Sequence, residues 1–155
     1  MAGEHVFDIV TGVQLEEGPS DYDPATIRVH TLNNNVLYAT PLKDNTLYNF
    51  AIAVDWDSNT LTVYASRDDA DLILESGPIT NDPKVIGAEN AQKGEWHVQL
   101  IKFPIPNPED PPEKQKDTPH YGQQETNIHE GVFFSRMFVE DGAGGKITRS
   151  ATAHR

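Results

Sequence analysis

The stretch from Asp44 to Ser66 constrains the fold more than any other part of this chain. From residue 47 its side chains alternate between large apolar positions and small or polar ones: Tyr48, Phe50, Ile52 and Val54 against Asn49, Ala51, Ala53 and Asp55. Period two over this length predicts a half-buried β-strand. Residues 57–59 (Asp-Ser-Asn) favour a turn, and the alternation resumes at Leu61, Val63 and Ala65. The sequence therefore predicts an antiparallel hairpin.

The polar face of this hairpin has two interpretations. Small and polar side chains at every second position are typical of a solvated outer face. The same side chains would also leave room for a ligand lying over the sheet, so both interpretations stay open at this point.

Other strand-like runs extend the pattern along the chain. They lie at residues 6–10, 26–30, 36–38, 96–102 and 132–140, and turn residues such as Asn33 to Asn35 separate them. Within 26–30, Ile27 and Val29 are expected to face the core. Residues 68–74 fit either one helical turn or an irregular loop. With no long segment of helical spacing, we expect an all-β fold, an antiparallel β-sandwich.

The length of 155 residues predicts one domain. We expect a single jelly-roll-like β-sandwich over residues 1–141, which includes a proline-rich surface loop at 103–120. That loop carries prolines and mixed charge, a composition that does not join a β-ladder. Residues 142–155 are expected to form a flexible tail.

The formal net charge of -12 limits the partners. Phosphate backbones and anionic membranes repel such a chain, so we expect neither nucleic-acid nor membrane binding. Neutral glycans remain compatible. The chain has no cysteine, and its first residues do not resemble a signal peptide. A complete chain of this sequence would accordingly be expected in the cytoplasm.

Two metal- or phosphate-like motifs fail on their spacing. Residues 55–59 resemble the start of a calcium loop, but Thr60 replaces the required Gly and Ser66 the bidentate Glu. Residues 142–146 resemble a phosphate loop without its Ser/Thr, since Ile147 follows. We therefore expect no metal site and no cofactor. Of the 24 acidic residues, none can be paired from spacing alone.

Four segments, taken in order, resemble glycoside hydrolase family 131, a group of fungal β-glucan hydrolases with a jelly-roll fold. They are the strand that ends at Asp55, its return strand at 61–66, the Trp-His strand at 95–102 and the segment from Glu130 to Glu140. The resemblance implies a jelly roll, complete or partial. It covers the C-terminal part of the family's domain, and the segments with the family's two proposed catalytic glutamates have no counterpart in it.

The resemblance also implies one site residue. His97 matches the family's histidine in the active cleft, and Gln99 stands beside it where the family prefers Gly. The remaining candidates for contacts with substrate are Asn49, Asp55, Glu130 and Glu140. The implied function is hydrolysis of β-1,3/1,4-glucan by a secreted type of enzyme.

Two other functions stay open. One is a non-catalytic glycan-binding module that holds sugar rings on aromatic side chains, with Tyr48, Trp56 and Trp96 as candidates. The other is an intracellular biosynthetic enzyme that binds a small polar ligand in the cleft that the family uses for its substrate. Because a partial jelly roll exposes sheet edges and an apolar face, we also expect either a homodimer that covers the open sheet or a smaller, rearranged sandwich.

Overall fold

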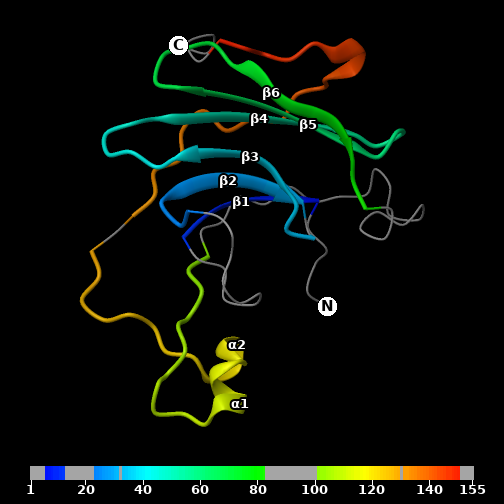
Figure 1. Cartoon of the computed structure of the whole chain (residues 1–155). Helices are drawn as coiled ribbons and strands as arrows, with labels where there is room; N and C mark the ends of the chain where they lie inside the picture. The colour runs from blue at the N-terminus through cyan, green and yellow to red at the C-terminus, as the bar shows by residue number, and fades with distance from the viewer. Residues whose placement is uncertain (1–5, 13–22, 32, 83–100, 130, 151–155) are drawn as a thin grey trace. The chain divides into compact units, whose positions relative to one another are not determined.

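The computed structural model describes residues 6–12, 23–31, 33–82, 101–129 and 131–150. These residues fall into two compact units. The first unit contains residues 6–12, 23–82 without 32, and 138–150, and the second contains 101–137 without 130. The six strands of the described residues, labelled in Figure 1, belong to the first unit.

The first three strands form one antiparallel sheet. β1 (Phe7–Thr11), β2 (Thr26–Thr31) and β3 (Val36–Pro41) are hydrogen-bonded in the order β1-β2-β3. β2 is the central strand, and Val29 at its middle is 0% exposed, as expected. Ile27 is half-buried. Asn34, in the turn before β3, has a φ of 60°, a left-handed conformation that asparagine tolerates.

The predicted hairpin forms the core of the second antiparallel sheet. β4 (Tyr48–Asp55) pairs with β5 (Thr60–Arg67), and β6 (Ile73–Thr80) pairs with β5 on its other side. The register places Phe50 opposite Ala65, Ile52 opposite Val63 and Val54 opposite Leu61. Directly opposed residues share one face of a sheet. The predicted apolar face of the hairpin is therefore confirmed, and its β5 members Leu61, Val63 and Ala65 are buried.

The two sheets contact each other through side chains of β3, β4 and β5. The ring of Tyr38 meets the ring of Phe50 edge-on, with centroids 6.2 Å apart. Arg67 donates a hydrogen bond to the hydroxyl of Thr40. The fold is thus all-β, with two three-stranded antiparallel sheets of the β-sandwich, jelly-roll-like class.

Strand β6 was not predicted, and the run at 132–140 was predicted wrongly. β6 contains Gly77 and Pro78, residues that weaken strand propensity, and it departs twice from regular pairing with β5. Residues 132–140 alternate like a strand, yet they form no ladder with any described residue. A strand exists only beside a pairing partner, which sequence alternation does not supply. The predicted strand at 96–102 lies outside the described residues except for 101 and 102, which are not in a strand.

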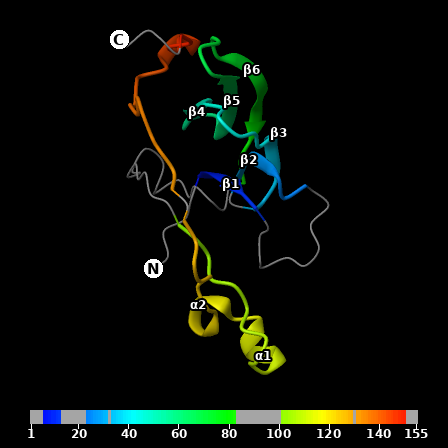
Figure 2. The same ribbon diagram turned by 90° about the vertical axis from the view of Figure 1, so that its left-hand side faces the viewer.

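The second unit holds the two described α-helices of the chain. α1 (Pro112–Gln115) and α2 (Thr118–Tyr121) are single turns that begin with proline near the N-terminus, where its missing N–H is not needed. They lie side by side in both views (Figures 1 and 2). Ile105 and Gln123 close this part of the chain through two backbone hydrogen bonds of 2.9 Å. The expected surface loop at 103–120 therefore contains short helical turns. None of the described helices has the length and apolar character needed to cross a membrane.

Candidate functional site

A hollow of about 350 Å³ lies in the first unit, where β3 approaches β5 and β6. Its walls combine apolar and charged side chains. The apolar ones are Tyr38, Ala65, Ala70 and Ile73, and the polar ones are Ser66, Arg67, Asp71 and Glu75. Small-molecule sites share this mixture of an apolar lining with a few polar groups.

Neighbouring side chains hold Arg67 and Tyr38 in place. Arg67 bonds to Thr40, and its guanidinium lies over the ring of Tyr48 at 5.9 Å from the centroid. Tyr38 rests against Phe50. A guanidinium has five N–H donors, so these contacts leave Arg67 with donors for a ligand. The hollow therefore offers a fixed hydrogen-bond donor next to an aromatic ring.

Two carboxylates line the same hollow. Within the part of the chain that the structure describes, the side chains of Asp71 and Glu75 make no hydrogen bond or ion pair. Glu75 owes its position to an irregular register: Val63 pairs with Ser76, but the next residue, Tyr64, pairs with Leu74. Glu75 is the extra residue between these two pairs. Such bulges re-aim a side chain, and they are frequent next to active sites.

The turn that carries Asp71 is anchored at several points. Asp68 exchanges hydrogen bonds with the backbone of Leu47, at 2.9 Å through its amide and at 3.0 Å through its carboxylate. Ser66 donates to the carbonyl of Ala70 at 2.8 Å. The backbone N–H of Leu72 donates to the carbonyl of Arg149 at 2.8 Å. The turn at 66–72, which forms one side of the hollow, is thus held in place by hydrogen bonds without a ligand.

Asn49, a candidate from the sequence, belongs to this anchoring set. Its side-chain amide donates to the hydroxyl of Ser66 at 3.0 Å and to the backbone carbonyl of Asp68 at 2.9 Å. Asn49 is on the polar face of β4, and it does not line the hollow itself. Through these two hydrogen bonds, Asn49 helps to hold the turn that follows β5 in place.

Asp55 lies at the other end of β4, about 20 Å from Asn49 at strand spacing. Its carboxylate accepts hydrogen bonds from the backbone N–H groups of Asp57 at 2.9 Å and Ser58 at 3.0 Å. Hydrogen bonds from Ser58, and then from Asp57, hold the pKa of Asp55 below its ordinary value, because they favour the ionised form. Asp55 is thus placed as the cap of the β4–β5 turn.

The remaining candidates are not brought together by the described structure. Glu140 accepts hydrogen bonds from the backbone N–H of Thr148 at 2.6 Å and from its hydroxyl at 2.7 Å. His97, Gln99 and Glu130 lie outside the described residues. Among the described residues, no group of acids and histidines is arranged to hold a metal ion.

Sequence reasoning did not single out two buried polar residues of β2. Arg28 is 1% exposed and His30 is 2% exposed, on the face opposite Val29. Arg28 donates to the carbonyl of Gly12 at 2.6 Å. A ring nitrogen of His30 lies 3.1 Å from the carbonyl oxygen of Thr31, so Nδ1 carries the proton there. Their shared face could have been read from the alternation of residues 26–30, but their burial could not.

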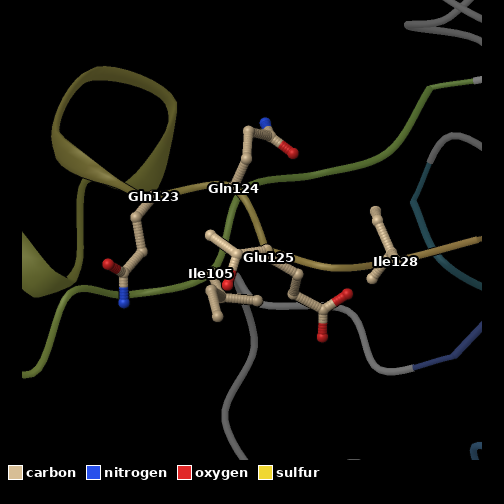
Figure 3. A pocket seen from close by; sticks show the side chains of 6 residues that line it. Ile105, Gln123, Gln124, Glu125 and Ile128 are labelled. Carbon is tan, nitrogen blue, oxygen red and sulfur yellow. The ribbon is translucent and has the colours of Figure 1, made fainter.

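A second hollow, of about 310 Å³, lies within the second unit beside the Ile105–Gln123 bridge. Figure 3 shows that its polar side chains do not converge, because Gln124 points away from Gln123 and Glu125. Glu125 is engaged with Lys102 at 2.7 Å. The hollow at Tyr38 and Glu75 is therefore the better candidate site.

Comparison with known proteins decides the family. A family model described as the glycoside hydrolase 131 catalytic N-terminal domain matches residues 2–145. The chain belongs to glycoside hydrolase family 131. The resemblance found in the sequence is confirmed by this match over nearly the whole chain.

Among solved structures, this family 131 chain is similar to the catalytic domain of the glycoside hydrolase family 131 protein from Coprinopsis cinerea. The two share 19% sequence identity with a TM-score of 0.43, and the alignment covers 50% of this chain and 30% of that chain. A comparison with curated proteins found no match.

Proposed function

We propose that this family 131 chain acts on β-glucan as a glycoside hydrolase, with mixed β-1,3/1,4-glucan as its substrate class. The observation that carries the proposal is the match of the family's catalytic-domain model to residues 2–145. The net charge of -12 agrees with a neutral polymer as substrate, since anionic polymers would be repelled.

The proposal assigns His97 to the cleft, as the resemblance implies, and keeps Gln99 and Glu130 as candidates for contacts with the substrate. Hydrolysis of a glycosidic bond needs two carboxyl groups on opposite sides of that bond. Asp55 and Glu140 are candidates from the sequence, but each already accepts two hydrogen bonds from its own neighbourhood. These two carboxylates are therefore less available to a substrate than unbonded ones would be.

A second candidate function is glycan binding without hydrolysis. The hollow at Tyr38 favours it, because this site offers an aromatic ring, a guanidinium and two carboxylates without requiring an acid–base pair. Binding and hydrolysis share a ligand class, so one set of substrates tests both functions.

The deciding experiment measures release of reducing ends from mixed β-1,3/1,4-glucan and from cellulose, together with binding to the same polymers. We expect release by the purified chain and its loss in His97→Ala. His120→Ala is the matched control, because His120 is an exposed histidine that bonds only locally to Asp117, at 2.7 Å.

Each outcome separates the alternatives. Equal rates of release by the unchanged chain and by His97→Ala would contradict the assignment of His97 to the cleft. Binding without release would leave the glycan-binding function, and neither binding nor release by a folded chain would refute both.

A further inference from the structure

We propose that the hollow bounded by Tyr38, Arg67, Asp71 and Glu75 is a sugar subsite that binds one glucose unit of a neutral β-glucan. This inference rests on the proposed action on glycans and adds the residues that recognise the sugar. It assigns recognition, not bond cleavage, to the two carboxylates.

The polar groups of the hollow complement sugar hydroxyls. A carboxylate only accepts hydrogen bonds and a guanidinium only donates them, whereas each hydroxyl of a glucose unit does both. Asp71 and Glu75 can each accept from neighbouring hydroxyls, and Arg67 can donate to a hydroxyl or a ring oxygen. Hydrogen bonds to charged groups contribute more free energy than those between neutral groups. This remains so after the loss of their hydrogen bonds to water is counted.

Charge and lining argue against anions and metal ions as ligands of this hollow. Two carboxylates against one guanidinium disfavour an anion. A metal ion prefers a cluster of oxygen ligands, but Arg67 stands among the acids and no metal-holding group occurs in the described ranges. The apolar surfaces of Tyr38 and Ile73 suit the C–H faces of a sugar ring. A neutral, ring-shaped polyol therefore fits this hollow best.

The backbone supports the same assignment. The extra residue in β6 turns Glu75 out of the regular ladder, and hydrogen bonds anchor the backbone of the turn at 66–72 that carries Asp71. An anchored backbone lowers the entropic cost of ordering these two side chains around a ligand. The unpartnered state of both carboxylates in the described structure leaves their acceptor sites available.

The test is titration of the full chain with cellotetraose and with a mixed-linkage glucan tetrasaccharide, by calorimetry and by NMR of the backbone amides. We expect Glu75→Gln and Asp71→Asn each to raise the Kd about tenfold or more, because each loses a charged acceptor. Asp44→Asn is the matched control, since Asp44 is an exposed acid in another turn and does not line the hollow. The shifted amides should lie at residues 38, 66–71 and 73–75.

Failure of the subsite and failure of the proposed function give different results. If the chain binds the tetrasaccharides and both variants bind as tightly as Asp44→Asn, the subsite is wrong while action on glycans stands. If the folded chain neither binds nor hydrolyses any β-glucan, both proposals fall. Shifts confined to residues outside the hollow would also overturn the subsite.

Discussion

The hydroxyl of Tyr48 on β4 donates a hydrogen bond to the carbonyl oxygen of Pro41 at the end of β3, at 2.8 Å. The same hydroxyl accepts one from the backbone N–H of Lys43, at 2.7 Å. One side chain thereby satisfies two backbone groups of the segment that leads from the first sheet to the second. The guanidinium of Arg67 over its ring joins β5 to the same point.

Replacing this tyrosine tests the connection. We expect Tyr48→Phe to lower the free energy of unfolding by about 1 kcal/mol, because it leaves a backbone donor and acceptor to water. Tyr64→Phe is the control, since the Tyr64 ring contacts Arg149 and its hydroxyl makes no hydrogen bond with the described residues. Urea unfolding followed by circular dichroism measures both. Equal stability of the two variants would contradict the role of the Tyr48 hydroxyl.

Asp55 predicts a pH dependence of stability. Because its pKa is lower in the folded chain than the ordinary value of 3.8, the unfolded chain binds more protons between the two pKa values. The stabilisation by Asp55 is therefore fully present above about pH 5 and is lost as the pH falls through the folded pKa.

The variant Asp55→Asn isolates this contribution, because an asparagine oxygen can still cap the turn but carries no charge. We expect the wild-type chain to be more stable than Asp55→Asn at pH 7, with the difference shrinking towards pH 3. Urea unfolding of both chains across this range provides the measurement. A difference that stays constant or grows as the pH falls would contradict the assigned pKa.

Gly77 in β6 has no space for a side chain. A Cβ there would lie 2.5 Å from the carbonyl oxygen of Leu61 and 2.7 Å from the Cα of Thr62, at a φ of 109°. We expect Gly77→Ala to cost about 2 kcal/mol or more. Gly12→Ala is the control for the backbone alone, because Gly12 has a φ of 79° and nothing within 4 Å of its Cβ position. It should cost about 1 kcal/mol, and equal costs would show that the contact with β5 is looser than described.

The sequence led us to expect either a homodimer that covers the open sheet or a smaller, rearranged sandwich, and the homodimer remains a prediction. Several large apolar side chains at 132–139 are exposed, including Phe133 at 98% and Val139 at 65%. Exposed apolar segments of this kind favour association. Light scattering at micromolar concentration should give twice the mass of the chain, and Phe133→Ser should lower that mass. A compact monomer would contradict the prediction.

The sequence predicted those elements whose signals are local. The alternation at 47–65 and the turn residues before Thr60 were enough for the hairpin and its apolar face. Asn59 adopts a φ of 51° in that turn, a conformation for which asparagine is well suited. The backbone N–H groups of Asp57 and Ser58 donate to the carboxylate of Asp55, which explains why Asp55 caps the turn.

The candidate hollow could not be predicted from the sequence, because the residues that line it lie far apart in the chain. Tyr38, Arg67 and Glu75 belong to three strands, and Glu75 lines the hollow because β6 carries an extra residue. Because β6 contains Gly77 and Pro78, its sequence did not indicate a strand. Conversely, the pattern at 132–140 indicated a strand although no described partner is present, because alternation reports amphipathic character and not pairing.

The two outer strands of the second sheet differ in their capacity to accept a further strand. β4 keeps an unbroken register of eight pairs with β5, whereas β6 departs from its register at two places. A bulged edge does not present evenly spaced donors and acceptors, so it resists the addition of another chain. A further strand, from the same molecule or from a neighbour, is therefore expected to pair with β4. The hollow beside Glu75 then stays open to solvent.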